Sequence, residues 1–400
     1  MVNLKNFIVV VGLGYVGLPL ATAAAKSGFN VIGIDLNQDK VANINSGKSP
    51  IEDIADSEIL DLVERGQFKA QSDFSQVKNA GVILICVPTP LTSEHRPDLS
   101  CLESAAKSIG EYLSKGTLII LESTVAPGTT REFLVPLIQK NSRIDISELD
   151  IAFSPERIDP LNPTWKLKNT PKVVAGLNLK SRKRAIDFYS KFVENLIECE
   201  NLEVAETAKL LENSFRLINI SFINELSIFC QKLGIEINDV INAASTKPYG
   251  FMSFYPSIGI GGHCIPVDPL YLANKAQEIG ASLKMINLAD QINREIPGYF
   301  VGRAEEKLGD LKAKKVLVIG VSYKPNVADV RETPVKALIS GLKNKGAQVY
   351  WHDDLVKEWN GEKSVTLSSD FDLAIIATPH DYLDLTKLGN MPILNTRGSI

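Results

Sequence analysis

The sequence has 400 residues, with 43 Lys and Arg against 47 Asp and Glu, so its net charge is −4. It lacks the basic excess of nucleic-acid-binding proteins, so we expect no nucleic-acid partner. No apolar run approaches the roughly 20 residues that span a bilayer, so we expect no membrane association. At roughly 150 residues per domain, the length predicts two or three domains.

Short apolar runs alternate with helical patterns in the first half of the chain. The runs show no polar alternation, as expected for strands that are covered by helices on both faces. We predict strands at 7–12, 30–35, 81–88, 117–124 and 150–156, and helices near 15–27, 38–46 and 101–114. This order predicts a doubly wound, mostly parallel sheet in a first domain of residues 1–197.

The first strand leads into a glycine motif typical of dinucleotide binding. Gly12, Gly14 and Gly17 form G-x-G-x-x-G, with Tyr15 and Val16 between the last two glycines. The glycines would allow a tight turn, close approach of a pyrophosphate and close packing of helix on strand. Asp35 ends the second strand, where a carboxylate can accept from ribose hydroxyls and repel a 2′-phosphate. We therefore predict that this domain binds NAD in preference to NADP.

Two polar loops follow the next strands of this sheet. VPTP contains Pro88 and Thr89, and ESTV contains Thr124. Ligands of open α/β sheets gather at the carboxyl ends of the strands. Thr89 and Thr124 are therefore predicted to lie on the nicotinamide side of the site, although Pro88 alone could simply end a strand.

A different pattern begins near residue 200. Residues 201–234 contain no proline, have no glycine before Gly234, and repeat apolar residues about every 3.6 positions. This predicts one long helix, apolar around much of its circumference, that other elements or a second chain must cover. We expect a homodimer through this helix, in a central helical domain of residues 198–308. That domain would also hold a turn-rich loop at 245–269 and a helical stretch at 270–308.

Strand and helix alternation returns at the end of the chain. We predict strands at 314–323, 347–352, 372–379 and 392–397, with a helix at 332–345. Residues 309–400 therefore form a second, smaller Rossmann-like domain. The predicted fold class is α/β, with two Rossmann-like doubly wound domains joined by a helical domain.

The five cysteines have no paired spacing, which argues against disulfides and favours the cytoplasm. Cys86 and Cys230 lie in apolar segments and are predicted to be buried packing residues, and Cys101 and Cys199 receive no role. Cys264 differs because it lies in the glycine-rich segment GIGGHCIPVDP. The chain has no second Cys/His pair at ligand spacing, so no metal is predicted.

Polar residues on the long helix complement this thiol. Lys209, Asn213 and Arg216 are spaced i, i+4 and i+7 and share one helical face. A solvated polar face is the plain alternative, but a lysine beside an amide can stabilise a developing oxyanion. A thiolate near a nicotinamide can add to an aldehyde and be carried on to a thioester, which water hydrolyses. These residues indicate oxidation of a primary alcohol or an aldehyde to a carboxylate.

Several motifs together resemble the UDP-glucose/GDP-mannose dehydrogenase family over nearly the whole chain. They are GLGYVGLPLA, VPTP, ESTVAPGTT, FSPERIDP, AKLLENSFR, FYPSIGIGGHCIPVDP and GVSYKPNVADVRETP. The resemblance implies an NAD domain, a central dimerisation domain and a C-terminal domain for the nucleotide sugar. It also implies that the chain ends sooner than usual after Arg397.

The resemblance also implies catalytic roles. Cys264 matches the nucleophile, and Lys209 and Asn213 match the pair that holds the substrate oxygen. Asp268 matches the acid that removes the first proton with an ordered water. Glu156 matches the acid of thioester hydrolysis, and Thr124 matches a hydroxyl near that water.

Further matches concern binding. The resemblance adds Arg331 to the NAD site. For the nucleotide sugar it adds the 254–261 loop, with Phe254, Tyr255 and Gly261, together with Lys324 and Arg397, whose charges suit a diphosphate or a sugar acid. Glu156, Lys209 and Asn213 also count as substrate contacts, and Arg157 and Arg216 are expected at the N-acetyl or diphosphate side.

The subtype motifs look like the branch that acts on UDP-N-acetylhexosamines. The UDP-glucose branch more often has serine before the cysteine and lysine before the aspartate, where this chain has His263 and Val267. SPERIDP looks more like UDP-GlcNAc or UDP-GalNAc 6-dehydrogenases than like UDP-ManNAc enzymes, which usually carry a CPER-type loop. Ser257 and Ile258 replace a more usual glycine-proline pair.

The expected activity is therefore NAD-dependent oxidation of C6 of UDP-GlcNAc or UDP-GalNAc to the uronic acid, for surface polysaccharide precursors. A UDP-ManNAc or UDP-glucose 6-dehydrogenase is the nearer alternative. A two-electron hydroxyacid dehydrogenase, which needs no thiol, and a catalytically silent nucleotide-sugar sensor are more remote alternatives.

Overall fold

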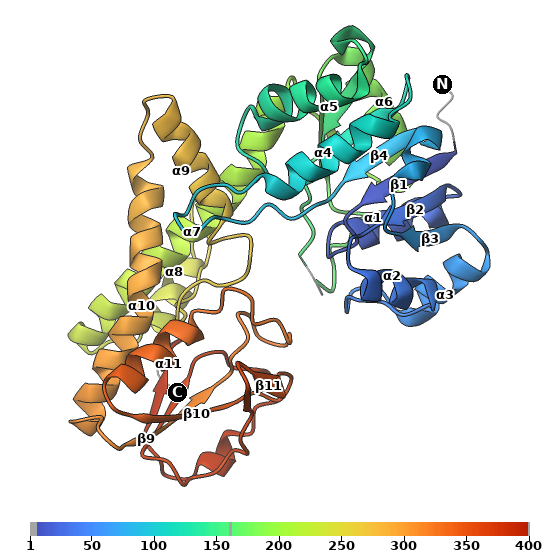
Figure 1. Ribbon diagram of the computed structural model, residues 1–400. Coiled ribbons are helices and arrows are strands. Elements are labelled where there is room, and N and C mark those ends of the chain that lie inside the picture. Colours follow the sequence, from blue (N-terminus) through green and yellow to red (C-terminus); the bar gives the residue numbers. More distant parts are fainter. Residues whose placement is uncertain (1–5, 160–161, 399–400) are drawn as a thin grey trace. The chain divides into compact units, whose positions relative to one another are not determined.

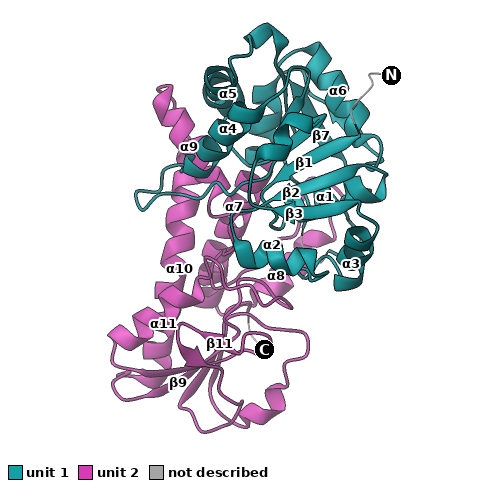
Figure 2. Ribbon diagram, turned by 45° about the vertical axis from the view of Figure 1, so that its right-hand side comes forward, with its two compact units in different colours: residues 1–211 teal, residues 212–400 magenta. Residues whose placement is uncertain are grey.

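The computed structural model describes residues 6–159 and 162–398 (Figure 1). The chain divides into two compact units, residues 1–211 and 212–400, which Figure 2 colours separately. The boundary between them falls within the long helix α7 (Leu202–Leu233). Pro160, the last residue of the FSPERIDP motif, lies outside the described residues.

Unit 1 is built on a single sheet, whose described strands follow the order β3-β2-β1-β4-β5-β6-β7-β8. Neighbouring strands are parallel except β6 and β7, which are antiparallel. The strands are β1 (Phe7–Val11), β2 (Asn30–Ile34), β3 (Phe68–Gln71), β4 (Val82–Ile85), β5 (Leu118–Leu121), β6 (Asp150–Phe153), β7 (Lys172–Gly176) and β8 (Leu196–Glu198).

Both faces of this sheet are buried, which explains the uniformly apolar strands. In β1, Ile8 and Val10 join the core under α1, α3 and α6, whereas Val9 and Val11 join the core under α4 and α5. The helices are α1 (Gly17–Lys26), α2 (Gln38–Asn45), α3 (Asp56–Glu64), α4 (Ser100–Tyr112), α5 (Val135–Ser142) and α6 (Leu179–Tyr189). The predicted doubly wound sheet is confirmed, but each of the five predicted strands is shorter than predicted, and β3, β7 and β8 were not predicted.

Unit 2 contains a smaller parallel sheet in the order β10-β9-β13-β14. Val316 and Val318 of β9 face the core that α10 and α11 cover, while Leu317 and Ile319 face a second core. The elements are β9 (Lys315–Ile319), α11 (Val335–Asn344), β10 (Gln348–His352), β13 (Leu373–Ile376) and β14 (Ile393–Asn395), with a hairpin of β11 (Glu358–Trp359) and β12 (Glu362–Lys363). A second Rossmann-like sheet is therefore confirmed.

Along the described chain, the helices between β8 and β9 are α7, α8 (Ile237–Ser245), α9 (Asp268–Glu278) and α10 (Lys284–Leu308). The prediction of one helical stretch at 270–308 is wrong, because α9 ends before Gly280, whose φ of +75° no helix accommodates. Pro269 in the first turn of α9 allows that helix to begin at Asp268. Asp268 therefore belongs to a helix start and not to the preceding loop.

Short helical turns complete the described chain: η1 (Ser75–Asn79), η2 (Thr130–Leu134), η3 (Ile146–Glu148) and η4 (Leu385–Leu388). Across the residues that the structure describes, no helix combines the length and the apolar character that crossing a membrane requires.

Candidate active site

The glycine loop after β1 has the geometry that its sequence predicts. Gly12 has φ +92°, and a Cβ there would lie 2.5 Å from the carbonyl oxygen of Cys86. A Cβ on Gly17 would lie 1.8 Å from the carbonyl oxygen of Gly12. A Cβ on Gly14 would meet no atom within 4 Å. Packing thus requires glycine at the first and third positions, and the second position leaves the backbone open to a ligand.

The start of α1 suits a negatively charged group. The helix begins at Gly17 without a side-chain cap at Val16 and without an acidic residue in its first turn. Tyr15 and Val16 are half-buried beside it. Uncapped N–H groups and the positive end of the helix dipole favour a phosphate here, so these residues fit the pyrophosphate of NAD.

Asp35 is fixed beside this loop. Its Oδ2 accepts hydrogen bonds from the backbone N–H of Leu13, at 3.0 Å, and from Lys40 Nζ, at 2.7 Å. Burial opposes ionisation, but the hydrogen bonds from Lys40, Asn37 and Leu13 outweigh it, so the pKa of Asp35 lies below its ordinary value. An anionic carboxylate therefore stands at the position predicted for the ribose.

The loops after β4 and β5 are joined to each other. The Thr89 hydroxyl donates to the carbonyl oxygen of Thr124 at 2.8 Å, and the Ser123 hydroxyl donates to that of Val87 at 2.6 Å. Pro88 is exposed between them. The predicted nicotinamide-side residues Thr89 and Thr124 therefore lie together.

A second polar group follows β6. The Glu156 carboxylate accepts a hydrogen bond from the backbone N–H of Ile158. Burial raises the pKa of Glu156, and the positive charge of Lys209 opposes that rise. Lys209 lies in α7 and is buried, so two of the predicted catalytic residues of unit 1, Glu156 and Lys209, interact electrostatically. Arg157 points its guanidinium to the carbonyl oxygen of Pro171 at 2.7 Å.

Three predicted catalytic residues come together in unit 2. Asn213 Nδ2 donates to Asp268 Oδ2 at 2.6 Å, and both residues are buried. The backbone N–H of Asp268 donates to the carbonyl oxygen of Cys264 at 2.8 Å. Cys264 is half-buried, whereas Cys86 and Cys230 are buried as predicted. Cys264 thus lies one turn before α9, and its backbone is bonded to Asp268, the residue whose carboxylate accepts from Asn213.

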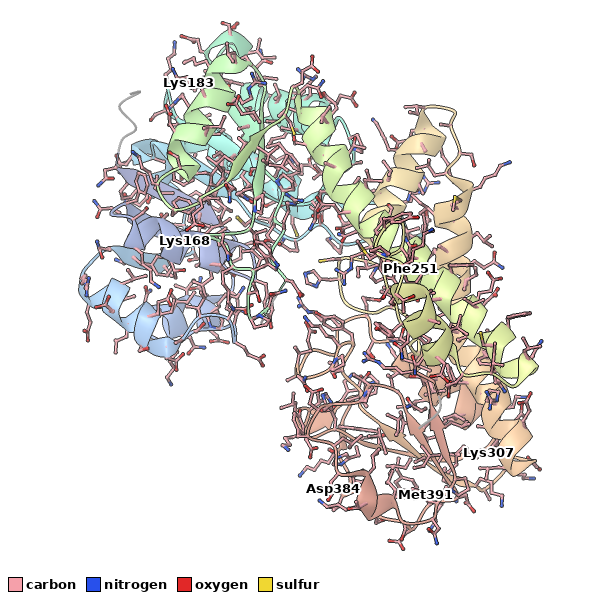
Figure 3. The ribbon with its side chains drawn as sticks, turned by 180° about the vertical axis from the view of Figure 1, so that it is seen from behind. Lys168, Lys183, Phe251, Lys307, Asp384 and Met391 are labelled. Atoms are coloured by element: carbon pink, nitrogen blue, oxygen red, sulfur yellow. The ribbon has the colours of Figure 1, made fainter. Side chains whose placement is uncertain are left out.

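The loop between α8 and α9, which Phe251 marks in Figure 3, packs on the segment after β9. A Cβ on Gly261 would lie 2.7 Å from the carbonyl oxygen of Glu332, and Gly262 N–H donates to the carbonyl oxygen of Arg331 at 3.1 Å. This packing places Gly261 beside Arg331, whose guanidinium pairs with Asp329.

The remaining predicted substrate residues of unit 2 are more dispersed. Phe254 packs edge-on against Phe215 of α7, with 5.7 Å between ring centroids, whereas Tyr255 and Arg216 are exposed. The carbonyl oxygen of Lys324 accepts from the Ser322 hydroxyl at 3.0 Å. Burial lowers the pKa of Arg397, which lies near Asp381.

Sequence reasoning missed three features. Glu206, a buried acid of α7, accepts from the backbone N–H groups of Gly128 and Thr130, and Lys172 pairs with Glu122 in the interior of unit 1. Glutamate and lysine within apolar segments were the only signals for them.

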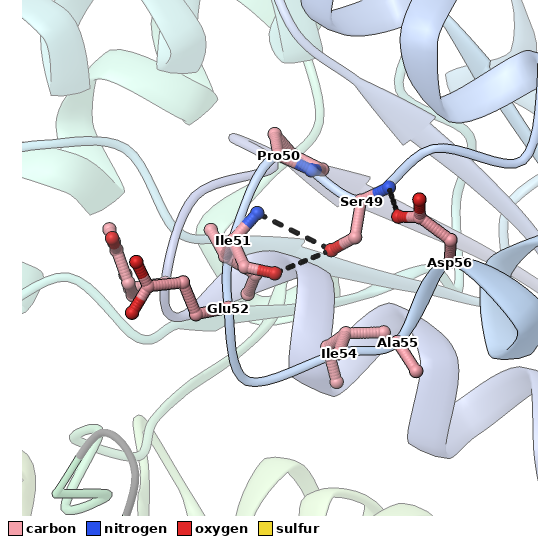
Figure 4. Close-up of a pocket in the computed structure, with 8 residues that line it drawn as sticks. Ser49, Pro50, Ile51, Glu52, Ile54, Ala55 and Asp56 are labelled. Carbon is pink, nitrogen blue, oxygen red and sulfur yellow. Dashed lines mark hydrogen bonds between the residues drawn. The ribbon is translucent and has the colours of Figure 1, made fainter. Parts of the chain in front are cut away.

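The third feature is a pocket of about 400 Å³ that Tyr15 lines together with residues 49–52 and 54–56 (Figure 4). Ser49 N–H donates to Asp56 Oδ1 at 2.7 Å and holds the ends of that loop together. The pocket adjoins the glycine loop through Tyr15. Separately, no group of three or more potential metal ligands occurs among residues 6–159 and 162–398.

Comparison with known proteins gives matches along the whole chain. Profiles of the UDP-glucose/GDP-mannose dehydrogenase family match in three parts: its NAD binding domain at residues 6–193, its central domain at 203–295 and its UDP binding domain at 317–396.

Individual relatives cover most of the chain. Protein CapL of Staphylococcus aureus is 33% identical over 95% of this chain and 91% of its own length. The UDP-N-acetyl-D-glucosamine 6-dehydrogenase of Pseudomonas aeruginosa is 35% identical over 86% of this chain and 81% of its own. The solved structure of the UDP-D-ManNAc dehydrogenase from Pyrococcus horikoshii is 30% identical, covers 98% of this chain and 95% of its own, and superposes with a TM-score of 0.91.

Proposed function

The chain belongs to the UDP-glucose/GDP-mannose dehydrogenase family, and on that premise we propose that it oxidises the C6 alcohol of a UDP-N-acetylhexosamine to the carboxylate. The family assignment makes it an NAD-dependent nucleotide-sugar dehydrogenase. The proposed reaction is a four-electron oxidation that consumes two NAD and one water and releases two NADH.

NAD, when bound, supplies the acceptor for the hydride that leaves C6 in each oxidation. The chain's own residues do the rest. The Gly12–Gly17 loop and Asp35 would hold the dinucleotide, and Thr89 and Thr124 would lie toward its nicotinamide. Arg331 is proposed as a further NAD contact.

The proton and acyl chemistry is assigned to side chains. Asp268, through a water, takes the hydroxyl proton as the alcohol becomes the aldehyde. Cys264 sulfur then adds to the aldehyde carbon, and Lys209 and Asn213 stabilise the oxygen of the thiohemiacetal. After the second oxidation, Glu156 activates water to cleave the thioester and release the Cys264 thiolate.

The single observation that carries the proposal is the cluster of Cys264, Asn213 and Asp268. Asn213 donates its side-chain amide to the Asp268 carboxylate at 2.6 Å, and the backbone N–H of Asp268 donates to the backbone carbonyl of Cys264 at 2.8 Å. A two-electron dehydrogenase has no use for the sulfur. The half-buried setting keeps that sulfur reachable for a substrate.

The sugar epimer is assigned from weaker signals. Ser154 in place of cysteine before Pro155 supports UDP-GlcNAc or UDP-GalNAc. The names of the relatives do not favour one epimer, because they include both UDP-N-acetylglucosamine and UDP-N-acetylmannosamine dehydrogenases. UDP-ManNAc is therefore the second candidate. Lys324, Arg397, Arg157 and the 254–261 loop are proposed to bind the nucleotide sugar.

The helix α7 supports a homodimer. Several of its large apolar side chains are exposed in the single chain: Leu211, Phe215, Phe222, Phe229 and Leu233. Phe222 and Phe229 are one heptad apart and lie on one face. A second copy of the chain would cover them. We place the enzyme in the cytoplasm, where its free thiols stay reduced, as a source of uronates for surface polysaccharides.

The proposal is tested by NADH release from UDP-Glc, UDP-GlcNAc, UDP-GalNAc and UDP-ManNAc. We expect two NADH per sugar with at least one N-acetylhexosamine and slower turnover of UDP-Glc. Cys264→Ser should abolish uronate formation, and Cys101→Ser, at an exposed thiol, should not. Two NADH per sugar from Cys264→Ser would refute the thioester route, and one NADH per sugar from the wild-type enzyme would identify a two-electron dehydrogenase.

A further inference from the structure

A buried ion pair lies inside unit 1, at the first residue of β7. Lys172 Nζ is 2.7 Å from Glu122 Oε2, and the two side chains are 6% and 0% exposed. The Tyr189 hydroxyl donates to the other oxygen of Glu122, and the ammonium lies 5.0 Å from the centre of the Tyr189 ring. Both charges are thus partnered without help from solvent.

Lys172 also reaches the backbone of the neighbouring strand. Its Nζ lies 3.5 Å from the carbonyl oxygen of Ser154 and 3.3 Å from that of Pro155. These carbonyls immediately precede Glu156. On the other side, Glu122 immediately precedes Ser123 and Thr124. One ammonium therefore links the carboxyl end of β5 to the carboxyl end of β6.

Packing alone does not account for this arrangement. Moving two charges out of water costs about as much as their attraction returns, so an apolar pair of similar size would stabilise the fold equally well. A second buried ion pair provides a comparison. Asp150, at the amino end of β6, pairs with buried Arg184. This pair lies at the opposite end of β6 from the loop that carries Glu156.

We propose that Lys172 is a positioning residue, which holds Glu156 and Thr124 in working geometry by cross-linking the ends of β5 and β6. This inference rests on the proposed function, in which Glu156 acts in thioester hydrolysis. There, water oxygen bonds to the thioester carbon, the carbon–sulfur bond breaks, Cys264 leaves as thiolate, and the water proton passes to Glu156. Lys172 touches no substrate and exchanges no proton.

The charge of Lys172 adds to its mechanical role. Burial raises the pKa of Glu156, the positive charges of Lys209 and Lys172 lower it, and the negative charge of Glu122 raises it. A base must be ionised to accept a proton from water, so a nearby ammonium favours the working form of Glu156.

The test uses the double variant Lys172→Met with Glu122→Gln, which leaves no unpaired buried charge. We expect a first burst of two NADH per active site at the wild-type rate, followed by turnover about 10- to 100-fold slower, because misplacing a catalytic group by about 1 Å has effects of this size. Because the thioester accumulates, KM for the UDP-sugar should fall together with kcat, and kcat/KM should stay within about twofold of the wild-type value. Intact-protein mass spectrometry should detect the sugar attached to Cys264.

The matched control is Arg184→Met with Asp150→Asn, which removes the ion pair at the other end of β6. We expect a melting temperature close to that of the Lys172 double variant, but wild-type kcat and no trapped adduct. Equal losses of kcat in both double variants would show general destabilisation and overturn the proposal. Wild-type kcat in the Lys172 double variant would overturn it while the proposed function stands. A wild-type enzyme that releases no NADH with any UDP-sugar would overturn both.

Discussion

Asn213 donates its side-chain amide to Asp268 across 2.6 Å, although the two residues are 55 positions apart in the chain. The bond joins α7 to the first turn of α9, and the backbone N–H of Asp268 in that turn donates to the carbonyl oxygen of Cys264, which lies one turn earlier. A hydrogen bond from an amide to a buried carboxylate is charge-assisted and orients both groups. These bonds therefore fix the orientation of the Asn213 amide and the Asp268 carboxylate and tie the backbone of Cys264 to the start of α9.

Asp268→Asn separates the charge of this residue from its shape. The new amide can still accept from Asn213 through its oxygen, so we expect a melting temperature close to that of the wild type. It cannot accept a proton, and general-base catalysis contributes about 10²- to 10⁴-fold, so kcat should fall by at least about 100-fold. Steady-state kinetics and thermal unfolding measure the two effects.

Asp290→Asn is the control for this variant, because Asp290 is also a buried carboxylate of unit 2 and pairs with Arg294 on α10. It should keep wild-type kcat. An Asp268→Asn enzyme with undiminished kcat would show that the carboxylate only holds Asn213 in place.

Asp35→Asn tests cofactor choice. Removing the negative charge should relieve the repulsion of a 2′-phosphate and weaken the hydrogen bonds from Leu13 and Lys40. A hydrogen bond to a charged group contributes about 1.5–3 kcal/mol. We therefore expect kcat/KM for NAD to fall about tenfold or more. The preference for NAD over NADP should shrink by a similar factor.

Asp39→Asn, at an exposed acid in the first turn of α2, should change neither value. If Asp35→Asn discriminates between the two cofactors as well as the wild type does, the carboxylate does not select NAD.

Prediction from the sequence succeeds where a single physical constraint fixes the residue type at a position. Gly12 and Gly17 could be placed because any Cβ there would collide with backbone, and β1 could be placed because both its faces are buried. The edge strands β3, with Lys69 and Gln71 among its four residues, and β8, which ends in Glu198, were missed because an edge needs little apolar sequence.

Contacts between distant residues were beyond the sequence for a different reason. The pairing of Asn213 with Asp268 depends on where α9 begins, and the prediction left Asp268 in a loop. Lys172 and Glu206 stood out only as charged residues within apolar segments, and their burial could not be predicted because it depends on partners that only the fold supplies. The helix pattern likewise ran through Gly280, because one glycine does not by itself show a positive φ.

Glu206→Gln tests a titration inside the fold. Burial raises the pKa of Glu206 to about 7, against the hydrogen bonds from Thr130 and Gly128. The folded state thus holds this proton more tightly than the unfolded state, whose pKa is near 4.5. The stabilisation is complete below pH 4.5 and is lost as pH rises to about 7, by up to about 3 kcal/mol.

Melting temperatures between pH 5 and pH 8 measure this effect. Relative to Glu206→Gln, the wild type should lose stability as pH rises. Glu203→Gln is the control, because Arg131 lowers the pKa of Glu203 by a side-chain hydrogen bond, so this carboxylate is ionised in both the folded and the unfolded state from pH 5 to pH 8 and should add no slope there. Parallel pH curves for the wild type and Glu206→Gln would mean that Glu206 does not titrate in this range.

Phe222 and Phe229 of α7 test the dimer. Each is 57% exposed in the single chain, and a buried phenylalanine contributes about 1.5–3 kcal/mol relative to an exposed one. Placing four glutamates in a two-fold interface should therefore turn the Phe222→Glu, Phe229→Glu variant into a monomer at micromolar concentration, as measured by light scattering after gel filtration. Leu36→Glu, at a residue 74% exposed in unit 1, should leave the mass unchanged. A wild-type enzyme that is monomeric would show that no such dimer forms. A double variant that keeps the dimeric mass would show that the second copy binds somewhere other than the apolar stripe on α7.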